Sequence, residues 1–139
     1  MADAVTTQLI EDGDRLVIYK FTNISDGTGE SGVLKIDVSA LNHLGGPSQS
    51  GLPCNGLKLN KIIASTTGMA VQMLWDATTD VLAWQVPPDS QYRTDLSLFG
   101  GIPNNAGSGK TGDLSFTTIG ATSGDMYSIV VECIKTYGY

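Results

Sequence analysis

The segment Gly107-Ser108-Gly109-Lys110-Thr111 has the residue types of a phosphate-binding loop, in which backbone N–H groups and a lysine hold phosphate oxygens. The full pattern requires a glycine five residues before Gly109, where this chain has Asn104. It also requires a strand before the loop and a helix after it, so that the helix N-terminus faces the phosphates. Residues 112–116 instead indicate a turn into a strand. We therefore expect a loop tip here and no nucleotide site.

Histidine and carboxylates offer little further chemistry. His43 is the only histidine, and no G-x-S-x-G element supplies a nucleophile for a triad. Asp26 and Glu30 flank Gly-Thr-Gly and could hold calcium with backbone carbonyls, but the dense oxygen pattern of a dedicated loop is missing. A carboxylate pair for glycoside hydrolysis stays open, although nothing selects a pair. We expect no catalytic residue, no metal and no cofactor.

The two cysteines have no short metal-binding spacing. Cys133 continues the alternating row of Tyr127, Ile129 and Val131, which favours a buried free thiol. A disulfide between Cys54 and Cys133 would need an oxidising compartment that nothing in the sequence announces.

A carbohydrate-binding module would present its tryptophan rings as a flat exposed platform, so the expected positions of the two tryptophans bear on this function. Trp75 shares an alternating row with Met69, Val71 and Met73, so we expect it to pack in a core. Trp84 fits either a buried or an exposed position.

Composition limits the class of protein. The chain has 139 residues, enough for a single domain with its own core. Charged residues make up 16% and the net charge is −6, with scattered lysines and arginines, which argues against nucleic-acid binding. Apolar runs are too short to span a membrane, and residues 1–5 lack the basic and apolar parts of a secretory signal. We expect neither a nucleic-acid nor a membrane partner.

Turn residues divide the chain every 8–14 residues, and no window carries a helical apolar stripe. Leu34, Ile36 and Val38 alternate with Lys35 and Asp37, which predicts a strand with one solvent-facing side. Two stretches rich in Gly, Pro or Asn, 42–56 and 100–112, predict long loops. The predicted strands cover residues 6–11, 15–23, 31–39, 57–66, 69–76, 81–86, 92–99, 113–119 and 126–136.

Eight or nine short strands at this spacing predict an all-β, two-sheet antiparallel sandwich, with a jelly-roll-like arrangement favoured over an immunoglobulin-like one. We expect one domain, residues 1–139, with chain ends that can extend. The final Tyr137-Gly138-Tyr139 is expected to dock on a neighbouring subunit, with fraying as the alternative.

Short phrases along the chain resemble small virion proteins of tailed bacteriophages, particularly phages of aquatic bacteria. The resemblance covers most of the chain and includes no catalytic signature. The phrases are residues 1–6, 20–31 (KFTNISDGTGES), 75–80 (WDATTD) and 101–107 (GIPNNAG), followed by a strand near the C-terminus.

This resemblance implies a head-decoration, or cement, protein: a non-enzymatic, β-rich homotrimer that binds the major capsid protein across capsomer boundaries. Such a protein is made in the host cytoplasm and ends on the capsid exterior of the virion. Chain ends and the loops 42–56 and 100–112 would reach the capsid, which makes the candidate interface residues Met1, Ala2, Val5, Asn104, Asn105, Tyr137 and Tyr139.

Three alternatives stay open. A phage tail, head-fibre or adhesion subunit is also structural, but a receptor-binding role predicts exposed aromatics and glycan affinity. A non-viral carbohydrate-binding module and an enzyme acting through carboxylates are the other two.

Overall fold

The computed structural model describes residues 3–44 and 51–138, which form nine β-strands and two short 3-10 helices. No helix in these residues has the length and apolar character needed to cross a bilayer. The elements are β1 (Ala4–Asp12), β2 (Leu16–Asp26), β3 (Val33–Ile36), η1 (Val38–Ala40), β4 (Cys54–Thr67), β5 (Ala70–Trp75), β6 (Val81–Val86), β7 (Gln91–Asp95), η2 (Ser97–Phe99), β8 (Leu114–Ile119) and β9 (Ser123–Tyr137).

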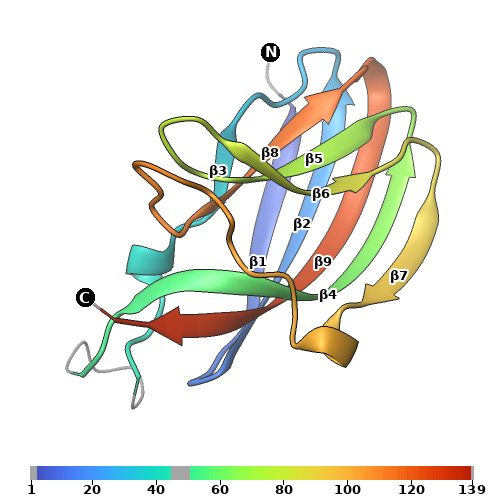
Figure 1. Cartoon of the computed structure of the whole chain (residues 1–139). Coiled ribbons are helices and arrows are strands. Elements are labelled where there is room, and N and C mark those ends of the chain that lie inside the picture. The colour runs from blue at the N-terminus through green and yellow to red at the C-terminus, as the bar shows by residue number, and fades with distance from the viewer. Residues whose placement is uncertain (1–2, 45–50, 139) are drawn as a thin grey trace.

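The strands form two antiparallel sheets with the orders β1-β2-β9-β4-β7 and β3-β8-β5-β6 (Figure 1). The pairs are nested: β2 pairs with β9, β3 with β8, β4 with β7 and β5 with β6. A long hairpin rolled up into two facing sheets gives this order, which is that of a jelly roll. β1 adds a fifth strand beside β2. The predicted all-β sandwich is confirmed.

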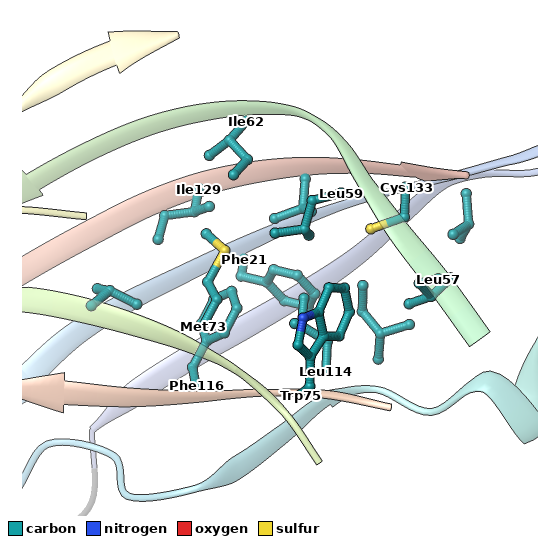
Figure 2. Packing of buried hydrophobic residues seen from close by; sticks show 14 of the residues in the cluster. Phe21, Leu57, Leu59, Ile62, Met73, Trp75, Leu114, Phe116, Ile129 and Cys133 are labelled. Atoms are coloured by element: carbon teal, nitrogen blue, oxygen red, sulfur yellow. The ribbon is translucent and has the colours of Figure 1, made fainter. Parts of the chain in front are cut away.

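The core lies between the two sheets, where alternate residues of each strand point inward. Trp75, Met73 and Phe116 of the smaller sheet face Phe21 and Ile129 of the larger one (Figure 2). The rings of Phe21 and Phe116 meet edge to face, with centroids 5.2 Å apart. The predicted core positions of Met69, Val71, Met73 and Trp75 are confirmed. The predicted burial of Cys133 is also confirmed, and both cysteines are free thiols.

The strand predicted at 31–39 is partly wrong. Only Val33–Ile36 is a strand, and a register shift between Leu34 and Ile36 breaks the alternation. As a result Leu34 is exposed, whereas Lys35 is only 8% exposed. Its Nζ lies 2.6 Å from Glu30 Oε2, so a residue predicted to face solvent forms a buried ion pair.

The strand predicted at 92–99 is also shorter than expected. β7 ends at Asp95, whose Oδ1 accepts a hydrogen bond of 2.9 Å from the backbone N–H of Ser97. This local bond turns the chain into η2, because an Asp side chain offers the backbone an alternative to the sheet.

The two longest connections, from β3 to β4 and from β7 to β8, start and finish at the same end of the jelly roll, and we call the opposite end, whose connections have at most six residues, the short-turn end. Residues 37–44, 51–53, 76–80 and 96–113 lie at the end where the two longest connections start and finish, together with the β1–β2 hairpin turn and the end of β9 (Figure 1). We call this the long-loop end. The connections at the other end, 27–32, 68–69, 87–90 and 120–122, are short. Long, structured loops on a rigid scaffold are where binding residues concentrate.

Candidate interface at the long-loop end

Lys135 fixes one side of the long-loop end. Its Nζ forms an ion pair of 2.6 Å with Asp12 Oδ1 and donates to the carbonyls of Gly13 and Asn42 at 2.9 and 2.8 Å. Burial lowers the pKa of Lys135, but the hydrogen bond and charge of Asp12 outweigh it, so the net shift is upward. The ammonium therefore stays charged and ties the hairpin, the last strand and the start of a long loop together.

Two further loops are tied to each other. The N–H of Thr78 donates to the Ser108 carbonyl at 3.2 Å, and the Thr111 hydroxyl donates to Asp76 at 2.8 Å. After Gly112 the chain enters β8, a strand, so the expectation that this segment is a loop tip is confirmed. Its geometry lacks the helix that a phosphate-binding loop needs.

Where the loop 96–113 meets the start of β4 and the end of β9, a hollow of 260 Å³ opens. Gly112 has φ +86°, and a Cβ there would lie 2.3 Å from the Asn55 carbonyl oxygen, so this loop packs backbone against backbone on the start of β4. The hollow is lined by Asn55, Lys58, Asn104, Lys110, Gly112 and Thr136, among others.

The hollow is cationic in a chain of net charge −6. None of its described lining residues is acidic, and among the residues that the structure describes neither Lys58 nor Lys110 forms an ion pair. Nearby carboxylates hold the loops themselves: Asp113 accepts from the Val38 N–H at 2.9 Å. Two ammonium groups beside amide side chains can receive a carboxylate and polar groups from another molecule.

The structure brings some of the predicted interface residues together and separates others. Asn104 lines the hollow and Asn105 is exposed beside it. Tyr137 is at the same end, but it packs on its own chain: its ring lies 5.6 Å from Lys135 Nζ, and its hydroxyl donates to the Asp14 carbonyl. Val5 lies toward the short-turn end of exposed β1. Met1, Ala2 and Tyr139 lie outside the described residues.

The other chemical candidates do not assemble into a site. Glu30 turns inward, where Oε1 accepts from Asn23 and from the Tyr127 hydroxyl, so it does not join Asp26 around a cation. Within residues 3–44 and 51–138 no three His, Cys, Asp or Glu side chains gather as a metal would require. His43 is half-buried in its loop.

Trp84 is half-buried, and its Nε1 donates to the Tyr92 hydroxyl at 2.8 Å. Since Trp75 is fully buried, the two tryptophans do not form a platform for sugar rings.

Nothing in the sequence indicates that Lys58 and Lys110 line the same hollow, because the two residues are far apart in the chain. They are brought together by the isolated bridge between Leu59 and Ile102, which lays the start of the last long loop along β4. Lys110, a single lysine in a glycine-rich loop, carries no pattern in the sequence that points to Lys58.

The chain matches no family model, no curated protein and no solved structure. Its function is therefore argued from its own residues and geometry.

Proposed function

We propose that this chain is a phage virion structural protein of the head-decoration type, which binds the major capsid protein on the head exterior through its long-loop end. The proposed role is binding without catalysis. After synthesis in the host cytoplasm, a symmetric oligomer, expected to be a trimer, would bridge capsomers. Because it binds the assembled shell better than free subunits, linkage would stabilise the shell.

One observation carries this proposal: the long loop 96–113, the start of β4 and the end of β9 converge on a single hollow with two lysines and no acidic lining residue among those described. The loops are held by hydrogen bonds such as Thr111 to Asp76 and by the ion pair of Lys135. A preorganised surface loses less conformational entropy on binding than a flexible one.

The fold supports the proposal by analogy. Jelly rolls occur in viral capsid proteins, but also in lectins and cupins, so architecture alone does not select a function. The buried Trp75 and the hydrogen-bonded Trp84 give no support to the carbohydrate-binding alternative. Nothing in the geometry favours a tail, head-fibre or adhesion subunit over head decoration.

Binding to isolated phage heads tests the proposal. Purified full-length protein is mixed with heads lacking it, and the bound fraction is measured by co-sedimentation. The double variant Lys58→Glu/Lys110→Glu should bind at least about tenfold more weakly, because truncated or reversed charges in a contact cost several kcal/mol. Lys61→Glu makes one such Lys-to-Glu exchange, half the charge change of the double variant, on an exposed strand position outside this hollow and should bind as the wild type does. Equal binding by the double variant and the wild type would overturn the proposed surface.

A further inference from the structure

The outer face of the larger sheet carries a row of four side chains that lie directly opposite one another. Lys20 of β2 pairs with Val130 of β9, Val130 with Ile63 of β4, and Ile63 with Arg93 of β7. Their neighbours along each strand fill the core, so these four face outward. The row therefore has two apolar side chains in the middle and a cation at each end.

A shallow hollow of 390 Å³ lies over this row. Its rim includes Ser65 and Ser128, and none of its described lining residues is acidic. Ile63 is 45% exposed, which is unusual for a large apolar side chain at the centre of a sheet face. In a chain of net charge −6, this is an apolar site with a local excess of positive charge.

The same molecule carries an apolar protrusion. Leu98 and Phe99 of η2 are 89% and 66% exposed, and we call these two residues the apolar turn. They follow β7 at the edge of the larger sheet (Figure 1). The turn is held in place because the N–H of Gly100 donates to Ser97 O at 3.1 Å and the N–H of Gly101 to Leu96 O at 3.0 Å.

Asp95, the last residue of β7, adds a carboxylate beside the apolar turn, and in its own chain it lies opposite Lys61. Asp95 is exposed and precedes the apolar turn, with its Oδ1 held by the Ser97 N–H at 2.9 Å. The segment thus presents one carboxylate followed by two large apolar side chains. The two apolar side chains match Ile63 and Val130 at the centre of the hollow, and the carboxylate, which forms no ion pair among the described residues, can approach a cation of a second copy.

We propose that the apolar turn of one copy of this chain inserts into the Lys20–Val130–Ile63–Arg93 hollow of a second copy, with Asp95 facing the cations of that hollow. The inference rests on the proposed function for the expectation of a symmetric oligomer, and it identifies the contact that forms it. The turn and the hollow are different patches of one chain, so each copy can donate a turn and accept one. Two copies related by a two-fold axis then form the contact twice, and three or more copies form it around a closed ring such as a trimer.

Sedimentation velocity of the purified full-length protein tests this contact. We expect an oligomer at roughly 50 μM, which requires a dissociation constant below about that concentration. Leu98→Ser/Phe99→Ser should raise the dissociation constant about 30-fold or more, because buried apolar anchors dominate interface energies. Ile63→Glu should do the same, since it places a carboxylate in the apolar centre of the hollow. Leu82→Ser is the matched control: Leu82 is 47% exposed on β6 of the other sheet and should leave association unchanged.

Mixing the two defective variants separates this contact from other modes of association. The Leu98→Ser/Phe99→Ser variant keeps an intact hollow and the Ile63→Glu variant an intact turn, so the mixture should associate more strongly than either alone. A monomeric wild type, or an oligomer unaffected by both variants, overturns the inference. Head binding is a separate measurement, because it depends on Lys58 and Lys110 at the long-loop end; an oligomer that forms as predicted but does not bind heads would contradict the proposed function alone.

Discussion

Replacing Lys35 with methionine should strongly destabilise the fold, because it leaves the Glu30 carboxylate inside the sandwich without its cation. The Lys35 and Glu30 side chains are 2% and 5% exposed, and their charged atoms lie 2.6 Å apart. Lys35 Nζ also lies 5.9 Å from the ring centroid of Phe21 and 5.7 Å from that of Phe116. The cation thus has three partners that favour its charged form.

The expected loss follows from this geometry. Breaking a buried ion pair by removing one partner costs about 3–5 kcal/mol, since the other charge stays buried and uncompensated. Glu30 keeps its hydrogen bonds from Asn23 at 2.9 Å and Tyr127 at 2.5 Å, which places the loss toward the lower end of that range. The Tyr127 hydroxyl remains a donor, because burial and then the bond to Glu30 raise its pKa.

Urea unfolding at neutral pH measures the effect. A loss of about 3 kcal/mol should lower the midpoint by roughly 1 M or more. Glu30→Gln/Lys35→Met should recover part of the loss, because a glutamine carbonyl still accepts both hydrogen bonds and leaves no unpaired charge. Lys61→Met, at an exposed position, should change stability by less than about 0.5 kcal/mol. If Lys35→Met costs no more than Lys61→Met, or if the double variant is as unstable as the two single losses added, the buried-pair argument is refuted.

Three further predictions concern the backbone, the thiols and pH. Gly112→Ala should lower the free energy of unfolding in urea by more than about 2 kcal/mol, because φ is +86° and the added Cβ would meet backbone atoms. Gly32→Ala, at φ +58° with open space around it, should lower it by only about 1–2 kcal/mol. Equal losses for the two variants would contradict the packing of Gly112 on Asn55. Burial raises the pKa of both Cys54 and Cys133, so a thiol reagent at mildly alkaline pH should label them only upon unfolding, and rapid labelling of the native protein would contradict their burial. Hydrogen bonds from the Thr28 side chain and backbone lower the pKa of Asp26, so its contribution to stability is present above its unfolded pKa and is lost as the pH falls through the lower folded value. Below about pH 4, the wild type should therefore lose stability more steeply than Asp26→Asn, and identical slopes in acid unfolding would contradict this assignment.

The architecture was predictable because the apolar alternation is regular where strands are long. Tyr127, Ile129, Val131 and Cys133 all point inward from β9, as period-2 alternation requires. Turn residues at short intervals fixed the number of strands, and the jelly roll is the arrangement that such a series of strands favours.

Irregular registers account for what the sequence did not predict. The register shift between Leu34 and Ile36 exchanges the environments expected for Leu34 and Lys35, so Lys35 is buried although its pattern indicates exposure, whereas Ile36 is buried as predicted. A similar shift between Met73 and Leu74 leaves Leu82 exposed, although Leu82, Trp84 and Val86 occupy alternate positions along β6. Register shifts depend on the partner strand, which local patterns do not reveal.

The candidate surfaces depend on contacts between distant parts of the chain. Lys58 and Lys110 line one hollow because the loop 96–113 lies along β4, through the bridge of Leu59 to Ile102 and the packing of Gly112 on Asn55, and the Lys20–Val130–Ile63–Arg93 row exists only in the strand order of the larger sheet. Composition predicted the loop 100–112, and the resemblance implied Asn104 as an interface residue, but neither indicated that Lys58 of β4 lies in the same hollow.

An image reconstruction of virus particles that contain this chain tests its proposed role most directly. The account predicts density for a jelly-roll oligomer on the head exterior, with the long-loop end and its Lys58 and Lys110 hollow against the capsid shell. Density at the tail, or on the head with the short-turn end against the shell, would contradict it.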